Sequence, residues 1–134
     1  MNPTLLTLET SISILTLHAN GVGQMHFKDG ITLDIVTQRE HLNGIIQLTE
    51  NKPTPFIVTA GDGVIITREA RDNAILIEDQ SPVNASGIVV QNLAYRMIAD
   101  FYMKIQRPKQ PYKVFTDVDK AFEWAKQYVG QQKI

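Results

Sequence analysis

The sequence predicts an α/β fold, in which strands and helices alternate along the chain. Short apolar runs at Pro55–Ala60, Gly87–Val90 and Tyr112–Phe115 are typical of strands in a buried parallel sheet. Between these runs, apolar residues recur every three or four positions, which is the spacing of amphipathic helices. This alternation predicts right-handed crossover connections and a mainly parallel sheet.

A hairpin is expected near the start of the chain. Residues 11–19 and 23–28 each have the pattern of a strand, and Asn20-Gly21 between them is a strong signal for a two-residue turn. With that turn, the side chains of His18 and His26 point to opposite faces of the hairpin. The hairpin therefore adds one antiparallel strand to the parallel sheet.

The complete order is β-β-α-β-α-β-α-β-α in a single domain spanning residues 1–134. We expect a five-stranded sheet, mainly parallel with one antiparallel strand, covered by four helices. Residues 4–10 could add an edge segment. The expected helices cover residues 32–51, 67–80, 93–105 and 116–129.

The composition is that of an ordinary soluble domain. A net charge of -1 and a pI near 6.3 argue against general binding to nucleic acid or anionic membranes. The absence of cysteine excludes disulfides, thiol chemistry and cysteine–zinc sites. No signal peptide is expected from the first residues, and no apolar run approaches the ~20 residues of a membrane span. We therefore expect a cytoplasmic protein with no nucleic-acid partner.

The helix expected at residues 93–105 is apolar on nearly all sides. A buried face is expected from Leu93, Ala94, Met97, Ile98, Phe101 and Ile105. Tyr95, Tyr102 and Met103 lie outside this face, so a neighbouring element or a second subunit should cover them. On this basis the sequence predicts a homodimer.

Few residues form a pattern that carries chemistry. His18, His26 and His41 have no carboxylate at metal-ligand spacing. Gly61-Asp62-Gly63 lies between a strand and a helix, where phosphate can bind, but it lacks the lysine of a P-loop, so an ordinary turn is the favoured interpretation. The serines lack a nucleophile elbow. We predict no catalytic, cofactor-binding or metal-binding residues, and no enzymatic activity.

Charged residues near the end of the chain allow two interpretations. A local basic cluster is formed by Lys104, Arg107, Lys109 and Lys113. The first interpretation is a functional patch, which binds an anion or a lipid headgroup or forms the rim of an interface. The second interpretation, a soluble loop whose charges balance the acids of the next helix, is favoured. Asp72, Glu78 and Asp79 have the pattern of solvated helix charges.

The second half of the chain carries the motifs of a known family. The matching segments are Ala99–Tyr102, Arg107-Pro108, Pro111, Val114–Thr116 and Ala121–Trp124, with Arg68–Arg71 in an earlier helix. In these segments and in its element order, the chain resembles an uncharacterised bacterial STAS-like family. That family has the fold of the anti-sigma-factor antagonists, which is related to the CRAL-TRIO lipid-transfer domains.

This resemblance implies a non-enzymatic regulatory or protein-interaction module with an unknown protein partner. The relation of this fold to the lipid-transfer domains implies an alternative, a small apolar-ligand or lipid-binding domain. The antagonists' phosphorylatable Asp-Ser-Ser-Gly motif is replaced here by Ile66–Glu69, and helix capping explains Thr67 in that segment without phosphorylation. Asp100 stands where the family often has asparagine.

The candidate partner or ligand surface combines the strand-end loops, two helix starts and the apolar helix. Its residues are Gly61, Asp62, Thr67, Arg68, Asn92, Tyr95, Tyr102, Met103, Arg107 and Lys109.

Overall fold

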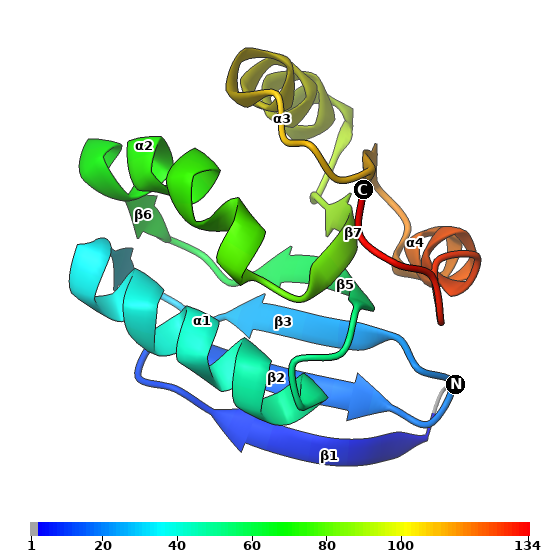
Figure 1. The fold of residues 1–134 in the computed structure, drawn as a ribbon. Coiled ribbons are helices and arrows are strands. Elements are labelled where there is room, and N and C mark those ends of the chain that lie inside the picture. The colour runs from blue at the N-terminus through cyan, green and yellow to red at the C-terminus, as the bar shows by residue number, and fades with distance from the viewer. Residues whose placement is uncertain (1–2) are drawn as a thin grey trace.

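A six-stranded mixed sheet forms the centre of the molecule (Figure 1). The computed structural model describes residues 3–134, apart from the side chains of Ile98, Phe101 and Tyr102. The strand order is β1-β2-β3-β5-β7-β8, and only β2 runs against the others. The strands are β1 (Thr4–Glu9), β2 (Ser13–His18), β3 (Gly23–Phe27), β5 (Thr54–Ala60), β7 (Val83–Val89) and β8 (Tyr112–Phe115).

The predicted α/β fold, mainly parallel with one antiparallel strand, is confirmed. The expected count of five strands was one short, because the segment at residues 4–10 does form an edge strand, β1, which pairs with β2. A small second sheet joins β4 (Thr32–Leu33) to β6 (Ile65–Ile66) in parallel.

Four α-helices and one 3-10 helix connect the strands. They are α1 (Ile35–Thr49), α2 (Arg68–Ile77), η1 (Glu78–Gln80), α3 (Leu93–Gln106) and α4 (Val118–Lys126). Each α-helix begins after an N-cap residue whose side chain accepts a hydrogen bond from a backbone N–H of the first turn. The four N-caps are Asp34, Thr67, Asn92 and Asp117.

The sheet has a hydrophobic core on each face. Phe56 and Ile57 are consecutive residues of β5, so their side chains point to opposite faces, and neither is exposed to solvent. On the Phe56 side, α1 supplies Ile45 and Leu48, whereas on the Ile57 side α4 supplies two alanines. Figure 1 shows α1 and α2 on one face and α4 on the other. The sheet is therefore covered from both sides, as the apolar strands predicted.

The hairpin differs from its prediction in one respect. The backbone N–H of His18 donates to the carbonyl of Val22 (3.0 Å), so the turn contains three residues and ends at Gly21 with φ +90°. The extra residue shifts the pairing by one position, and Ile14 lies opposite His26. The prediction that His18 and His26 point to opposite faces was wrong, because both belong to the face that α4 covers.

Gly23 is a position where β3 tolerates no side chain. A Cβ atom there would lie 2.6 Å from two carbons of the Phe56 ring, which is fully buried and cannot move aside. We expect Gly23→Ala to destabilise the fold by about 1–3 kcal/mol through overpacking, measured by urea unfolding. The double variant G23A/F56L should lose less free energy of unfolding than the two single variants lose together, because leucine at position 56 makes room for the methyl group at position 23. A G23A protein as stable as wild type would contradict this packing.

Candidate functional site

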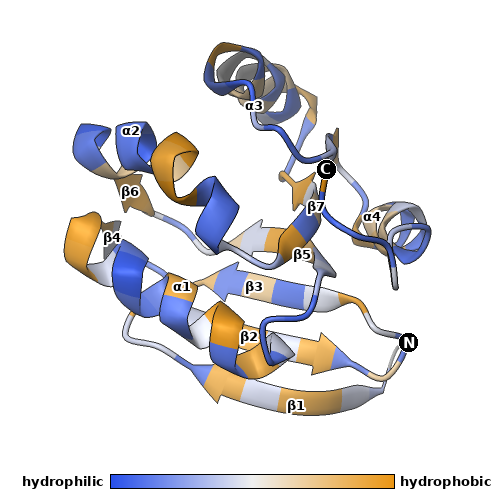
Figure 2. Cartoon of the chain, viewed as in Figure 1, coloured by the Kyte–Doolittle hydropathy of each residue, from blue (hydrophilic) through white to orange (hydrophobic). Residues whose placement is uncertain are grey.

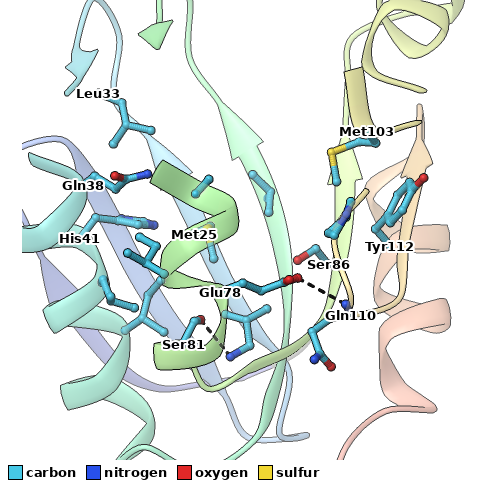
Figure 3. Close-up of a pocket in the computed structure, with 17 residues that line it drawn as sticks. Met25, Leu33, Gln38, His41, Glu78, Ser81, Ser86, Met103, Gln110 and Tyr112 are labelled. Carbon is cyan, nitrogen blue, oxygen red and sulfur yellow. Dashed lines mark hydrogen bonds between the residues drawn. The ribbon is translucent and has the colours of Figure 1, made fainter. Parts of the chain in front are cut away.

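An open cleft lies on the Phe56 face, between α1 and α2 on one side and α3 on the other. Its volume is about 240 Å³. The cleft exists because α3 packs against the edge strand β8 and leaves the centre of the sheet uncovered. Ten lining residues are apolar, namely Met25, Leu33, Leu42, Ile45, Val58, Ala74, Ile77, Val83, Met103 and Pro108. Figure 3 shows the polar side chains around it, which include Gln38, His41, Glu78, Ser86, Gln110 and Tyr112.

Gln38 joins the two helices on one side of the cleft. Its Nε2 donates to the carbonyl of Ala70 (2.8 Å), and its Oε1 accepts from Nδ2 of Asn73 (2.9 Å). Both partners belong to α2, so a buried amide whose two ends are bonded holds α1 against α2. The helical spacing of this segment predicts an outward-facing Gln38. This prediction is wrong because the packing of α2 on α1 cannot be seen in either segment alone.

His41 is the buried titratable group of this wall. Its Nδ1 lies 2.8 Å from Oγ of Ser13, and its ring packs 4.9 Å from the ring of Phe27. Burial lowers the pKa of His41 to about 4, so the ring is neutral at pH 7. Ser13 is fully buried beneath α1 and also bonds Thr10. A serine–histidine pair is therefore present, but its hydroxyl is buried and does not line the cleft.

The far end of the cleft is closed by backbone hydrogen bonds. The Glu78 carboxylate accepts from the backbone N–H of Lys109 (3.0 Å) and of Gln110 (3.3 Å). Asp79 pairs with Nζ of Lys109 at 3.2 Å. Glu78 and Asp79 are thus not simply solvated helix charges, as the pattern suggested, because both anchor the loop between α3 and β8.

The C-terminal segment strengthens this end. Nζ of Lys133 donates to the carbonyls of Glu78 (2.8 Å) and Ser81 (2.6 Å). The Gln110 amide donates to the carbonyl of Ile134 (2.9 Å) and accepts from its N–H (3.0 Å). One short segment therefore bonds both sides of the cleft.

The basic residues do not form a single patch. Lys109 is bonded to the acids of η1, whereas Lys113 lies on the other face of the sheet with its Nζ 5.4 Å from the centre of the Phe115 ring. Arg107 is exposed and ends α3 in a left-handed conformation, with φ 48°. The structure therefore offers little support for an anion site built from all four bases.

The loops at the carboxyl ends of the strands are bonded to one another. The Asp29 carboxylate accepts from the N–H of Asp62 (2.9 Å), and the Asp62 carboxylate accepts from the Gln91 amide (3.3 Å). A Cβ atom on Gly61 would overlap the Asp29 carboxylate. The N–H of Asp62 could have bound a phosphate, but it is already bonded to the Asp29 carboxylate. This agrees with the interpretation of Gly61-Asp62-Gly63 as an ordinary turn.

Beside these loops lies an apolar patch that the sequence pattern did not reveal. We call this group of exposed residues the β4–β6 patch. It consists of Ile35, Val36, Ile65 and Ile66, and the side chains of Ile65 and Ile66 point to opposite faces of the small sheet because the two residues are consecutive in β6. The exposed fractions of these residues are 41%, 77%, 59% and 44%. Figure 2 shows the hydrophobic start of α1 beside β6. The available signal is the apolar run Val64–Ile66, although its position after Gly61-Asp62-Gly63 predicts a loop there.

The outer face of α3 is a second exposed apolar surface. Leu93, Met97 and Ile105 are 66%, 67% and 62% exposed, although the helical pattern had placed all three in the core. Ala94 is exposed as well. The prediction was wrong because α3 packs at the edge of the sheet and turns its other side, including Met103, toward the cleft.

The predicted surface residues are spread over separate places. Gly61, Asp62, Thr67, Arg68 and Asn92 belong to the strand-end loops and the two helix starts that follow them, where Thr67 and Asn92 are N-caps. Tyr95 is 52% exposed on α3. Met103, Arg107 and Lys109 lie in the cleft or the loop that follows α3, and the side chain of Tyr102 lies outside the described residues.

The described part of the chain, residues 3–134, offers neither a metal site nor a membrane-spanning helix. Within it, no three His, Asp or Glu side chains come together in a way that could hold a metal ion. No helix among residues 3–134 has the length and apolar character needed to cross a bilayer.

The pKa of His41 predicts how stability depends on pH. Between pH 6.5 and about 4 the unfolded chain binds a proton that the folded chain does not. Above pH 6.5 the protonation of His41 therefore takes nothing from the free energy of unfolding. As the pH falls toward 4, the free energy of unfolding decreases by up to about 3 kcal/mol. We expect urea unfolding of His41→Gln to show a shallower loss over this range than wild type. The control, Leu76→Ala, changes an exposed residue that does not titrate and should keep the wild-type slope. An unchanged slope in H41Q would contradict the assignment.

Comparison with known proteins identifies the fold and the family. A search of the curated proteins finds no match. A crystal structure of an uncharacterized protein of the DUF3478 family with a SpoIIAA-like fold, from Shewanella loihica PV-4, is similar with a TM-score of 0.54 and 10% sequence identity. The similarity covers 93% of this chain and 95% of that protein, and it confirms the STAS-like, SpoIIAA-like fold. A family model described as "Domain of unknown function (DUF7793)" matches residues 15–129, and the chain belongs to this family.

Proposed function

We propose that this protein is a non-enzymatic, cytoplasmic regulatory module that binds another protein through the β4–β6 patch. The observation that carries the proposal is the exposure of four branched aliphatic side chains on one small sheet and the helix start beside it. A soluble domain exposes single apolar residues at random, but a group of this kind marks an interaction site.

The patch is held in a fixed shape. β4 pairs with β6, so Leu33 lies opposite Ile66. The helix that follows each strand is capped, by Asp34 bonded to the N–H of Thr37 (2.9 Å) and by Thr67 bonded to the N–H of Ala70 (3.1 Å). Because this backbone is already ordered before binding, the binding of a partner costs little conformational entropy of this chain.

The absence of enzymatic activity is part of the same proposal. The Ser13–His41 pair is the arrangement that most resembles a nucleophile and base, and both of its members are buried. The Thr67 hydroxyl is occupied by the helix cap, so the proposal needs no phosphorylation at that position.

A matched pair of variants tests the patch. Ile65→Asp places a charge in the patch, whereas Leu76→Asp places one on α2 outside it, at a residue that is 75% exposed. We expect a partner captured from the host and then purified to bind I65D at least about tenfold more weakly than wild type, which corresponds to about 1.4 kcal/mol in calorimetry. Binding to L76D should be unchanged. Equal affinities of wild type and I65D would count against the patch.

The cleft supports a second candidate function, the binding of a small apolar ligand. Its lining is mostly apolar and includes a few polar groups, which is the usual composition of a ligand site. However, the cleft is open and has a volume of about 240 Å³, whereas typical ligand pockets have roughly 300–1,000 Å³. The size and openness therefore favour the protein-binding candidate.

A direct measurement separates the two candidates. If the cleft takes an apolar ligand, native mass spectrometry of gently purified protein should show a co-purifying mass. Ala74→Phe, which fills the cleft from α2, should remove that mass, and Leu76→Ala on the outside of the same helix should keep it. No added mass in the wild type would reject the ligand candidate.

A further inference from the structure

We propose that β1 pairs with β1 of a second copy of this chain, in antiparallel orientation, so that the two sheets join into one across a two-fold axis. β1 contains none of the residues of the β4–β6 patch, so the inference does not rest on the proposed function. The interaction surface is the free edge of the sheet at residues 6–9.

The outer edge of β1 carries backbone groups that no described segment of the chain pairs. β1 is the first strand in the sheet order and has β2 as its single neighbour among the described strands (Figure 1). The N–H of Thr10 donates to the carbonyl of Ser13 (2.8 Å), and hydrogen-bonded residues alternate along an antiparallel pair. Leu8 therefore bonds to β2, whereas the N–H and C=O groups of Thr7 and Glu9 point away from it. Because such an edge is a template for another strand, its hydrogen-bonding groups specify an extended chain as the occupant.

The edge lacks the main features that keep edge strands from pairing. Residues 6–8 contain no proline and no charge. Glu9 forms an ion pair with Lys28 at 2.8 Å, so its charge is balanced within the same chain. The irregularity of β1 lies between Thr4 and Leu6, and residues 6–9 pair regularly with β2. A regular and uncharged stretch is therefore open to a further strand.

The sequence of β1 is complementary to itself in one antiparallel register. If the two-fold axis passes between the two Thr7 residues, these residues exchange two hydrogen bonds, and Leu6 lies opposite Leu8 of the second copy. Leu6 and Leu8 both point to the Phe56 face, where Leu8 packs against the core and Leu6 is 52% exposed. This register brings four leucines together on one face, whereas the registers that pair Leu6 or Leu8 with itself bring two together. A two-fold interface requires such a match, because the same surface serves both copies.

An open groove on the same face leaves room for the added strand. It has a volume of about 480 Å³ and lies between the end of β1 and α1. Its lining includes Leu8 from β1 and the exposed residues Arg39, Asn43 and Gln47 from α1. A leucine placed opposite Leu8 would therefore enter this groove, and α1 does not block the edge.

Sedimentation velocity on the full chain, from about 1 to about 300 µM, tests the pairing. Because two short strands bury a small interface, we expect the wild type to change from monomer to dimer within this range. Thr7→Pro removes a backbone N–H that points outward from the edge, so the variant should stay folded and remain monomeric. Leu6→Lys places a charge in the leucine cluster without changing the backbone, and it should remain monomeric as well. Circular dichroism of each variant confirms that it is folded.

The control variant lies on α3, the helix from which the sequence predicted a homodimer. Leu93→Lys introduces the same charge at a residue that is 66% exposed, and it should dimerise like the wild type. An L93K protein that stays monomeric would place the interface on α3 and overturn the pairing through β1.

A single cysteine tests the register, because the chain has no cysteine of its own. The register brings the two Cα atoms of position 7 to about 5.5 Å, a distance that a disulfide can span. Thr7→Cys should therefore form a disulfide-linked dimer under mild oxidation, seen by non-reducing gel electrophoresis. The two copies of position 5 would lie about 13 Å apart, so Leu5→Cys should link at least about tenfold more slowly.

Three further results would overturn the proposal. They are a wild type that stays monomeric up to about 300 µM, folded T7P and L6K proteins that still dimerise, and an L5C protein that links as fast as T7C. The first of these results would leave the edge to an extended segment of a different protein.

Discussion

The burial of β5 on both of its faces is the constraint on which the rest of the structure depends. Phe56 and Ile57 have no exposure to solvent, yet their side chains point in opposite directions. Each residue therefore requires its own cover, which α1 provides on one side and α4 on the other. The parallel pairing of β5 with β3 and β7 follows, because crossover helices can then cover both faces.

The same constraint explains why apolar surface remains exposed. Once α1 and α4 have covered the two faces, α3 packs mainly against the edge strand β8, and the cleft separates it from α2. The short β4–β6 sheet is separate from the six-stranded sheet, and Ile65 and Ile66 in it remain exposed. The exposed apolar groups thus follow from the topology and from the number of helices available to cover a six-stranded sheet.

The sequence predicted the features that depend on local pattern. The alternation of strands and helices and the N-caps at Thr67 and Asn92 follow from neighbouring residues. The STAS-like fold was expected from the family resemblance and is confirmed. The errors arose where the outcome depends on packing between distant segments. Gln38 is buried because α2 supplies both hydrogen-bond partners, and Leu93 is exposed because α3 lies at an edge. Likewise, one additional residue in the hairpin turn shifted the pairing of β2 with β3.

The bonds of Lys133 and Ile134 have a consequence for how the molecule moves. Lys133 is attached to the η1 side of the cleft and Ile134 to the α3 side, through Gln110. These two neighbouring residues therefore connect the η1 side of the cleft to the α3 side and limit how far the two sides can separate. Separating the walls requires these bonds to break, together with the bonds that the Glu78 carboxylate accepts from the N–H groups of Lys109 and Gln110.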